Sequence, residues 1–520
     1  MAASGSTAFR NEPYLDFSVP ANREAMERAL SKVRSEFGHE YRLRLGNEWI
    51  ATDDRLSSVN PSKPAEIVGV HHRATAEIAK RAVETAYAAF PKWSGTPARE
   101  RVRMALEAAR ILRERRFEMD AWLSFEAGKT WPEAEAELAE AVDFCEYYAR
   151  EMQRLSGPQA VVQLEGEHDE MVYIPLGVGV VIPPWNFPLA ILAGMTIAAL
   201  ITGNTVIIKP SSETPTIAAK FAGILLEAGF PEWSFTLLVG SGSAVGDVLV
   251  NHPKTRFVAF TGSRDVGLRI NELAAKAQPG QVWIKRVVAE MGGKDAIIVD
   301  AESDLDKAVD GVVASAFGYQ GQKCSACSRA IVDAKVYDQF LEKLAPKVKA
   351  IRMGPAEDPG NYMGPVISAG ARKSILEYIE TGKKEGRVVA GGDATPDGGY
   401  FVQPTVIADI DSKARLFQEE VFGPVLAVTK ARDFEHALDL ANDSQYGLTG
   451  AVYSNNPKHL AAAKERFHVG NLYFNRKCTG AMVGAHPFGG FNMSGTDSKA
   501  GGPDYLLLFL QAKSVATRLP

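Results

Sequence analysis

The order of apolar and polar residues divides the chain into a helical first part and two later parts in which strands and helices alternate. Helical patterns dominate between about residues 74 and 154, where every fourth position from Ile78 to Phe90 is apolar. This spacing places apolar side chains on one face of an amphipathic helix. The first 60 residues are mixed and polar, and residues 41–52 are predicted to form a short hairpin.

Short runs with the composition of strands follow the helical part, and helical stretches lie between them. The predicted strands are residues 178–182, 205–208, 235–239 and 256–260, and the predicted helices are 189–202, 215–228 and 244–250. Strands that alternate with helices favour a parallel, doubly wound sheet, which binds ligands at the carboxyl ends of its strands. We therefore expect functional residues directly after positions 182, 208, 239 and 260.

A second alternation of strands and helices begins at residues 295–299 and predicts a second α/β unit. Its expected helices include 304–317 and 337–351, and its later strands lie near 425–428 and 450–453. The fold class is therefore α/β, with two large units. The last part of the tail, residues 506–517, is β-prone and could pair with another chain.

Composition and charge narrow the classes of function. Of the 520 residues, 46% are hydrophobic and 23% are charged, which is ordinary for a protein with large cores. The net charge of −5 is spread over both signs, without the basic stripe that binds nucleic acid. The most apolar charge-free segment, residues 187–202, is shorter than the ~20 residues that span a bilayer, so no membrane span is expected.

The cysteines and the first ten residues predict a cytoplasmic protein. Four cysteines in so long a chain cannot form a disulfide framework and are expected to be reduced. Residues 1–10 contain no apolar segment of the kind that directs export. Cys324 and Cys327 form a single CxxC without a second ligand cluster, so no metal site is expected. Cys145 and Cys478 are expected to be small apolar core residues.

Residues with distinctive chemistry follow the first two predicted strands. After Ile182 come Trp185, whose ring offers a flat face, and Asn186, whose amide is a donor at the start of a helix. Lys209 follows the second strand and suits a ribose or phosphate oxygen. A core aromatic ring and a solvated charge are the simpler interpretations of Trp185 and Lys209.

Small residues follow the other two strands. Gly240, Gly242 and Gly246 have a spacing one residue longer than the usual dinucleotide fingerprint, and alone they could be turn formers. After Phe260, residues 261–263 would let a backbone approach a pyrophosphate at a helix N-terminus. Because such residues occur at four consecutive strand ends, we expect a nucleotide site along this edge.

Cys324 and Glu290 are the candidate reactive residues. Cys324 lies in a Gly-rich turn followed by a possible helix, and a helix N-terminus lowers the pKa of a thiol; a buried structural cysteine is the alternative. Glu290 ends a strand-like run in an apolar, Gly-rich context. Partial desolvation there would raise its pKa towards that of a useful base. A capping or ion-paired glutamate is an equally open interpretation.

Six segments together resemble the aldehyde dehydrogenase superfamily over nearly the whole chain. They are Pro184-Trp185-Asn186-Phe187-Pro188, Phe260-Thr261-Gly262-Ser263, Glu290-Met291-Gly292-Gly293-Lys294, Gly321-Gln322-Lys323-Cys324, Glu419-Glu420-Val421-Phe422-Gly423-Pro424 and Pro487-Phe488-Gly489-Gly490. The resemblance implies three parts. A Rossmann-like NAD(P)-binding domain comprises residues 1–160 and 175–290, a catalytic domain 291–495, and a small β oligomerisation flap 161–174 and 496–520.

The resemblance also implies a mechanism and a cofactor, NAD, with NADP as the alternative. Cys324 would attack an aldehyde, Asn186 and the Cys324 backbone N–H would stabilise the oxyanion, and Glu290 would activate water to hydrolyse the thioester. Lys209 and Glu420 would hold ribose hydroxyls, Phe422 the nicotinamide end, Ser263 the pyrophosphate and Trp185 the cofactor's flank. The other residues expected at the cofactor are Ile182, Pro184, Ser212, Gly240, Gly242, Gly246, Phe260, Thr261 and Gly262.

Further segments resemble the 1-pyrroline-5-carboxylate dehydrogenase branch of the superfamily. They are residues 140–144, 324–326, 470–477, 479–481 and 483–484. This branch oxidises L-glutamate γ-semialdehyde to glutamate in proline degradation. By resemblance, Ser325 and the backbone N–H groups of Gly480 and Ala481 would hold the substrate carboxylate. Phe187 and Phe488 would flank its aliphatic chain, and Glu140 would face its ammonium.

Departures from the family pattern leave some alternatives open. Ser212 replaces a Glu that many NAD-preferring relatives carry, which removes a repulsion against the 2′-phosphate of NADP. His486 and Asn492 replace residues common beside the substrate loop, so another semialdehyde or a broad aldehyde range is the alternative substrate. A CoA-acylating enzyme is disfavoured by Glu290, and a non-enzymatic relative by the presence of Cys324, Glu290 and Asn186.

Two partner expectations follow from the resemblance. The family forms dimers by exchanging β-flaps, so a homo-oligomer built from dimers is expected. No proline-oxidising segment precedes these residues, so we expect a functional link to a separate proline dehydrogenase.

Overall fold

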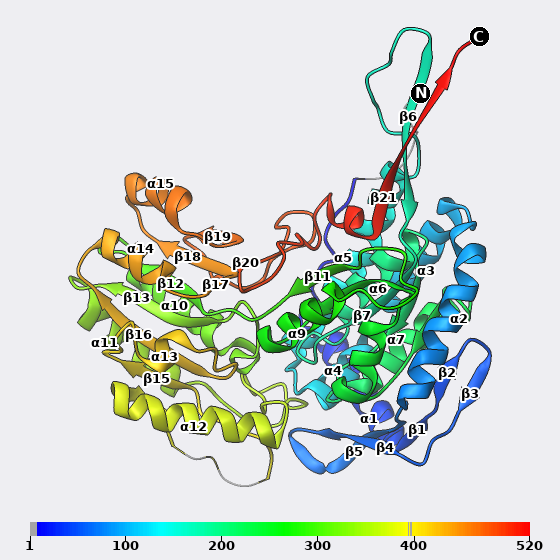
Figure 1. Ribbon diagram of the computed structural model, residues 1–520. Coiled ribbons are helices and arrows are strands. Elements are labelled where there is room, and N and C mark those ends of the chain that lie inside the picture. Colours follow the sequence, from blue (N-terminus) through cyan, green and yellow to red (C-terminus); the bar gives the residue numbers. More distant parts are fainter. Residues whose placement is uncertain (1–7, 394, 396–397) are drawn as a thin grey trace.

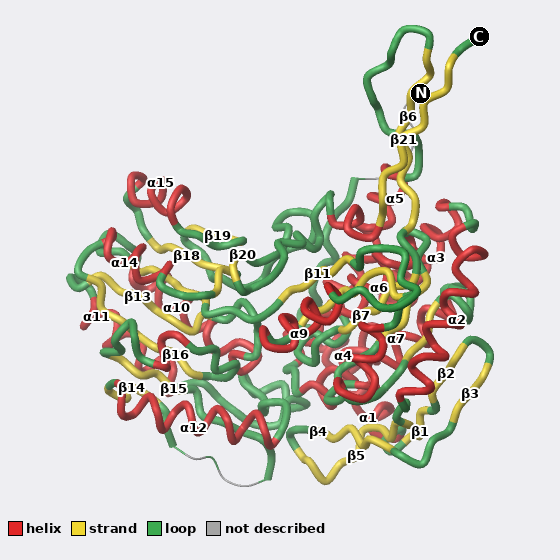
Figure 2. The backbone as a smooth tube through the Cα atoms, in the orientation of Figure 1, coloured by secondary structure: helices red, strands yellow, loops and turns green. Residues whose placement is uncertain are grey.

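A computed structural model describes residues 8–393, 395 and 398–520. Two seven-stranded sheets form the two halves of the molecule, and a two-stranded ribbon projects from one of them (Figures 1 and 2). The mixed α/β class is the one predicted. The expectation that residues 1–10 contain no export signal rests mostly on residues 1–7, which lie outside the described residues.

Helices dominate residues 76–155, as predicted for residues 74–154, and one further helix lies in the N-terminal segment, where the sequence predicted none. They are α1 (Pro20–Ser35), α2 (Ala76–Ser94), α3 (Ala98–Glu114), α4 (Arg116–Ala127) and α5 (Trp131–Leu155). Helix α2 begins after Thr75, whose side chain accepts a hydrogen bond from the Ile78 N–H, and it buries Ile78, Ala82 and Ala86. Helix α5 packs against α3, α4 and α6 and carries one wall of the cavity described below.

The first large sheet has the order β11-β10-β7-β8-β9-β2-β3. Its strands are β2 (Leu43–Leu45), β3 (Glu48–Ile50), β7 (Val178–Ile182), β8 (Thr205–Ile208), β9 (Phe235–Leu237), β10 (Thr255–Thr261) and β11 (Arg286–Glu290). The five strands from β7 to β11 are parallel to one another, and β2, which pairs antiparallel with β9, forms the predicted antiparallel hairpin with β3. The connecting helices are α6 (Ala190–Ile201), α7 (Pro215–Glu227), α8 (Asp247–Asn251), which a π-helical turn (Gly242–Gly246) precedes, and α9 (Arg264–Ala275).

The second large sheet has the order β14-β15-β16-β13-β12-β18-β19. Its strands are β12 (Asp295–Val299), β13 (Cys327–Asp333), β14 (Arg387–Ala390), β15 (Thr405–Ala408), β16 (Val425–Ala431), β18 (Thr449–Tyr453) and β19 (Asn471–Phe474). Its helices are α10 (Leu305–Phe317), α11 (Tyr337–Lys349), α12 (Ala369–Glu385), α13 (Arg415–Gln418), α14 (Phe434–Asn442) and α15 (Pro457–Arg466). Short 3-10 turns cover Gly318–Gly321 and Tyr505–Phe509. Apolar cores lie on both faces of this sheet.

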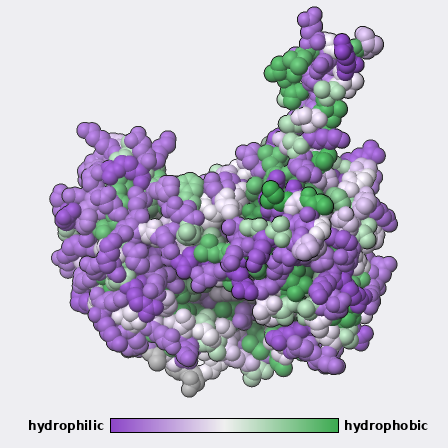
Figure 3. All heavy atoms as spheres, in the orientation of Figure 1, coloured by the Kyte–Doolittle hydropathy of each residue, from purple (hydrophilic) through white to green (hydrophobic). Residues whose placement is uncertain are grey.

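Three smaller sheets complete the fold. Strands β1 (His39–Tyr41), β4 (Arg55–Asn60) and β5 (Lys63–His72) form one, and β17 (Tyr446–Gly447) and β20 (Phe491–Asn492) form another. In the projecting ribbon, β6 (Glu167–Pro175) pairs antiparallel with β21 (Leu510–Arg518). The segment that precedes β6 exposes Val162 and Leu164, and apolar residues are visible on the projection in Figure 3.

The tail was expected to pair with another chain, and here it pairs with β6 of its own chain. Exchange of this ribbon between copies stays a prediction, as do the expected domain boundaries. The most apolar charge-free segment, residues 187–202, contains α6. Nearly all of the 12 residues of this helix are buried. Across the described part of the chain, no helix has the length and apolar character to cross a membrane. All four cysteines are free thiols.

Candidate active site

A cavity of about 350 Å³ lies between α5, α6 and the loops that lead into the second sheet. It brings together residues that are far apart in the sequence. Those that the sequence singled out are Glu140, Phe187, Thr261, Glu290, Cys324, Ser325, Gly480, Ala481 and Phe488. Both candidate reactive residues and all six candidate substrate residues therefore face one space.

A sharp backbone turn delivers Cys324 to this cavity. Helix α10 ends at Phe317, and Tyr319, Gln320 and Gly321 then have φ values of 49°, 56° and 65°. A Cβ on Gly321 would lie 2.4 Å from the Gly423 carbonyl oxygen, so only glycine fits there. The Tyr319 hydroxyl donates to Ala127 O at 2.9 Å, and Gln320 Nε2 donates to Pro365 O at 2.7 Å. These anchors hold the left-handed turn in place.

The predicted helix after Cys324 is wrong, because strand β13 begins three residues later at Cys327. The expected lowering of the thiol pKa is wrong as well. Burial raises the pKa of Cys324, and the nearby carboxylates of Asp295 and Glu290 raise it further. Among the described residues no helix begins at Cys324, so the thiol has to lose its proton by another route before it can attack.

Glu290 is the last residue of β11, at the strand end that the sequence predicted. Burial raises its pKa to about 7, although hydrogen bonds from Ser498 and Gly490 partly oppose this. The Ser498 hydroxyl donates to Oε1 at 2.5 Å, and the Gly490 N–H donates to Oε2 at 3.1 Å. A carboxylate with this pKa can serve as a base near neutral pH, as predicted.

The pH profile should report this glutamate. Because the base acts when ionised, kcat should rise as the pH increases through about 7. Replacing Ser498 by Ala removes a donor that stabilises the carboxylate, so the midpoint should move to higher pH. Initial rates from pH 5.5 to 9, at saturating substrate, would measure both profiles. Coincident midpoints for the two proteins would contradict the assignment of this ionisation to Glu290.

Asn186 lies in the loop between β7 and α6 and is buried. Its Nδ2 donates to the Gln322 carbonyl oxygen at 3.0 Å, two residues before Cys324. One amide hydrogen therefore tethers the side chain to the cysteine turn. The other amide hydrogen has no acceptor among the described residues, although Asn186 itself does not line the cavity.

The four strand ends with distinctive residues lie next to one another in the first sheet, since its order runs β10-β7-β8-β9. Burial lowers the pKa of Lys209 to about 8, and its Nζ donates to Pro210 O at 3.2 Å. The rings of Trp185 and Phe422 meet edge to face, with centroids 5.3 Å apart. Glu420 accepts a hydrogen bond from the Gly293 N–H at 2.9 Å, and burial raises its pKa to about 7.

The remaining candidate cofactor residues line the same strand ends. Ile182 ends β7 and Pro184 follows it, while Ser212 lies between β8 and α7. Gly246 packs beside the Lys209 side chain, and Ser263 is the N-cap of α9. Gly240 and Gly242 follow β9, Phe260 and Thr261 end β10, and Gly262 follows it. The Gly262 N–H donates to the Glu290 carbonyl oxygen at 3.1 Å, which ties this edge to the candidate base.

The candidate substrate residues surround the cavity from three sides. Burial raises the pKa of Glu140, on α5, to about 8, so a cationic group would be a favourable neighbour. Ser325 follows the cysteine and is buried. Gly480 has φ 76°, and Arg476 donates to the carbonyl oxygens of Thr479 and Gly480 at 3.0 and 2.9 Å. The backbone of this loop is therefore held in a defined position.

Sequence reasoning missed residues that position the site. Ser498 gave no motif, and it reaches Glu290 only through the fold. Lys129 lies fully buried, 2.9 Å from Glu137 and 3.9 Å from the ring centroid of Phe187. Glu137 Oε1 also accepts the N–H groups of Leu189 and Ala190, at the start of α6. Buried charges such as these position the start of a helix and one wall of the cavity. No local sequence pattern predicts them.

Comparisons with known proteins agree with this geometry. Residues 49–515 match the model of the aldehyde dehydrogenase family. A 1-pyrroline-5-carboxylate dehydrogenase from Geobacillus thermodenitrificans is 57% identical over 508 residues, which cover 98% of this chain and 99% of the relative.

Solved structures are similar over nearly the full chain. A 1-pyrroline-5-carboxylate dehydrogenase from Thermus with bound NAD has a TM-score of 0.97 and 50% identity, and 99% of this chain and 100% of that one are covered. Proline utilization A from Bdellovibrio bacteriovorus has a TM-score of 0.96 and 45% identity, over 98% of this chain and 53% of that chain. The chain therefore belongs to the aldehyde dehydrogenase family.

Proposed function

We propose that this protein oxidises L-glutamate γ-semialdehyde, the open form of 1-pyrroline-5-carboxylate, to L-glutamate, with NAD as the electron acceptor. One observation carries the proposal. A single cavity holds a thiol and a base with a raised pKa, together with Ser325, the 480–481 backbone and the carboxylate of Glu140. The 57% identity to a 1-pyrroline-5-carboxylate dehydrogenase supports the same substrate.

Cys324 is the nucleophile. Its thiolate attacks the aldehyde carbon and forms a thiohemiacetal whose oxygen carries the negative charge. The Asn186 amide and the Cys324 backbone N–H stabilise that oxygen, because preorganised donors favour the charge as it develops. Burial and nearby carboxylates disfavour the resting thiolate, so the thiol proton has to pass to solvent before the sulfur attacks. Glu290, with a pKa of about 7, lines the same cavity and stays ionised for the later hydrolysis step.

The edge formed by β7, β8, β9 and β10 fits a dinucleotide. Lys209 is a buried ammonium whose Nζ has one hydrogen-bond acceptor among the described residues, so it can donate to ribose hydroxyls. Glu420 would accept from the second ribose, and Trp185 and Phe422 would flank the ring system. When bound, NAD supplies the nicotinamide carbon that accepts the hydride from the thiohemiacetal.

Glu290 completes the cycle. Its carboxylate removes a proton from water, which attacks the thioester carbonyl and releases glutamate and the Cys324 thiolate. The hydrogen bonds from Ser498 and Gly490 fix the orientation of the carboxylate for this step. A hydrolytic base in this position also explains why water, rather than a thiol cofactor, receives the acyl group.

The polar ends of the substrate have complementary groups among the residues that line the cavity. Ser325 and the N–H groups of Gly480 and Ala481 would bind the carboxylate, since neutral donors hold an anion without a costly buried counter-charge. Glu140 would pair with the ammonium, and Phe187 and Phe488 would enclose the carbon chain.

Two partners belong to the proposal. This chain corresponds to 53% of a longer protein named for proline utilisation, which leaves room there for a second activity. A proline dehydrogenase would supply the substrate of the present chain. We also propose a cytoplasmic homo-oligomer in which the β6–β21 ribbon contacts a second copy, because an isolated two-stranded ribbon with exposed apolar residues is marginally stable.

The substrate assignment predicts strong discrimination between aldehydes. With NAD, kcat/KM for 1-pyrroline-5-carboxylate should exceed that for butanal, which lacks both charged groups, by at least ~100-fold. Replacing Ser325 by Ala removes one carboxylate donor and should lower that ratio about tenfold. Ser328→Ala is the matched control, because Ser328 lies three residues further on and is absent from the cavity wall. Turnover of butanal alone would contradict the substrate and leave the family assignment standing.

A further inference from the structure

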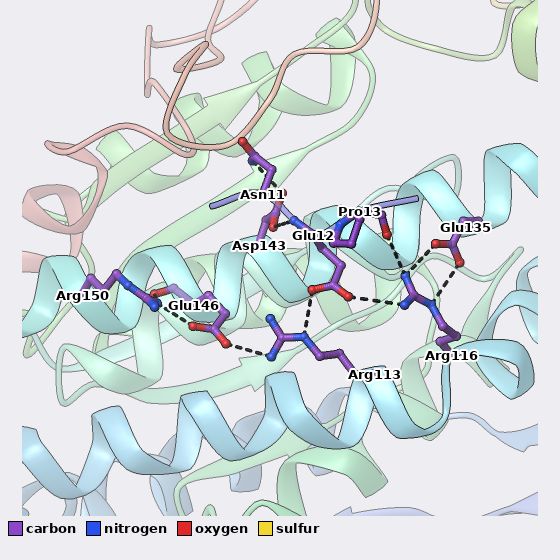
Figure 4. Close-up of polar contacts among 9 residues, drawn as sticks. All are labelled: Asn11, Glu12, Pro13, Arg113, Arg116, Glu135, Asp143, Glu146 and Arg150. Carbon is purple, nitrogen blue, oxygen red and sulfur yellow. Dashed lines mark hydrogen bonds and ion pairs between the residues drawn. The ribbon is translucent and has the colours of Figure 1, made fainter. Parts of the chain in front are cut away.

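Residues 9–15, called the strap below, run across α3, α4 and α5 at the mouth of the cavity. Figure 4 shows three of them, Asn11, Glu12 and Pro13, beside the helix that carries Glu135 and Asp143. The motifs that identified the catalytic residues do not include this segment. Tyr14, within the strap, lines the cavity together with Glu140 and Met482.

Charged residues fix the strap to the helices. Arg113 Nε and Arg116 Nη1 donate to the two carboxylate oxygens of Glu12, at 2.8 and 3.3 Å. Arg116 also donates to Glu135 at 2.6 Å, and Glu135 in turn accepts the Leu15 N–H at 2.9 Å (Figure 4 shows the arginine contacts). Both arginines come from the α3–α4 region, so the strap has a fixed position relative to α5.

The opposite side of the strap contacts the loop that follows the proposed carboxylate donors. Asn11 Nδ2 donates to Asp143 Oδ2 on α5 at 2.7 Å and to the Val483 carbonyl oxygen at 3.0 Å. The Tyr14 hydroxyl lies 3.5 Å from the sulfur of Met482. Phe9 packs so closely against Gly484 that an added Cβ would meet its ring at 3.1 Å. Three strap residues thus touch three consecutive residues of the loop.

These contacts join the two walls that would bind opposite ends of the substrate. Gly480 and Ala481 precede Met482 directly, and Glu140 lies one helical turn before Asp143 on α5. One asparagine amide therefore connects the loop of the carboxylate donors to the helix of the ammonium acceptor. The distance between these two sets of groups determines which amino-acid aldehyde fits.

We propose that the strap is a specificity-determining element, in which Asn11 holds residues 482–484 against α5 and thereby sets the spacing between the carboxylate donors and Glu140. The inference rests on the function proposed above. Asn11 is a positioning residue, since it touches the loop and the helix but does not line the cavity. Loosening the loop should weaken the binding of a substrate that uses both ends and leave the reacting thiol unaffected.

The test compares two substrates in one variant. Asn11→Leu keeps the side-chain volume and removes both donated hydrogen bonds. We expect KM for 1-pyrroline-5-carboxylate to rise about tenfold, KM for butanal to change less than about twofold, and kcat for butanal to stay within about twofold of wild type. Tyr14→Phe, which removes a single contact at the cavity mouth, should raise KM for 1-pyrroline-5-carboxylate by about two- to threefold.

Asn22→Ala is the matched control. Its side chain donates to Asp16 O at 2.9 Å in the same N-terminal region but does not reach the loop, so both KM values should match wild type. Thermal melting of every variant separates weakened folding from altered specificity. If Asn11→Leu does not fold, Asn11→Ser replaces it, because a serine hydroxyl cannot reach both acceptors.

Two outcomes would overturn the proposal. Equal increases in KM for both aldehydes would make the strap a general structural cover, and unchanged KM values in a folded variant would make the contacts irrelevant to binding. The wild-type rates separate this result from a failure of the proposed function. A wild-type protein that does not oxidise 1-pyrroline-5-carboxylate disproves the substrate before any variant is considered.

Discussion

Cys324→Ala should abolish NADH formation with every aldehyde, with a fall in kcat of at least about 10⁴-fold. The thiol forms the covalent bond that makes hydride removal possible, and an alanine at position 324 removes this thiol from the cavity wall. The left-handed turn before position 324 is anchored by Tyr319 and Gln320, so the fold should survive the change. Initial rates and thermal melting of the variant would check both statements.

Cys145→Ala is the matched control for loss of a thiol. Cys145 is fully buried on α5 and does not line the cavity, so its loss should leave kcat within about twofold. Residual turnover by Cys324→Ala above about 1% of wild type, after contamination is excluded, would assign the nucleophile elsewhere.

Glu290→Gln should convert steady turnover into a single burst. The amide cannot deprotonate water, so hydrolysis of the thioester should slow by about 10²–10⁴-fold while hydride transfer still occurs once per subunit. Stopped-flow absorbance of NADH should therefore show a burst approaching one equivalent, followed by a slow phase. Acid quenching and mass spectrometry should find the acyl group on Cys324.

The burst distinguishes the role of Glu290 from a general loss of structure. A variant that lacks both burst and steady rate would place Glu290 in thiol activation, for which the raised pKa of Cys324 creates a need. A variant with wild-type steady turnover would exclude Glu290 as the hydrolytic base. Glu465→Gln, an exposed change far along the chain on α15, provides the control and should retain both phases.

The sequence predicted the sheets well because their strands are buried and contain short, nearly continuous apolar runs. The segments 178–182, 205–208 and 295–299 coincide with β7, β8 and β12. Their alternation with helices placed the four strand ends along one edge. Glu290 at the end of β11, and the raised pKa that its apolar context implied, followed from the same reasoning.

The surroundings of Cys324 were harder to predict. Glycines beside a cysteine indicate a turn, but whether a helix or a strand follows depends on the neighbouring strands that pair with it. Here β12 and β16 pair with residues 327–333, and this tertiary pairing outweighs the local preference. The carboxylates that raise the thiol pKa come from distant segments, so their effect cannot be read from residues near the cysteine.

Positioning residues remained hidden for the same reason. Ser498 lies 208 positions from Glu290, and Asn11 lies 472 positions from Val483. Neither belongs to a periodic pattern or a recognisable motif. The resemblance to a family identifies residues that carry chemistry, whereas the residues that orient them are found only when the chain is folded.

The path of the chain between the two large sheets gives Glu290 a particular mechanical place. Glu290 ends β11 in the first sheet, and only Met291, Gly292, Gly293 and Lys294 separate it from β12 in the second. Cys324, in contrast, is held by the second sheet ahead of β13. The first sheet therefore fixes the position of the base and the second sheet fixes that of the nucleophile. Any shift of one sheet relative to the other would change the distance between the two reacting groups.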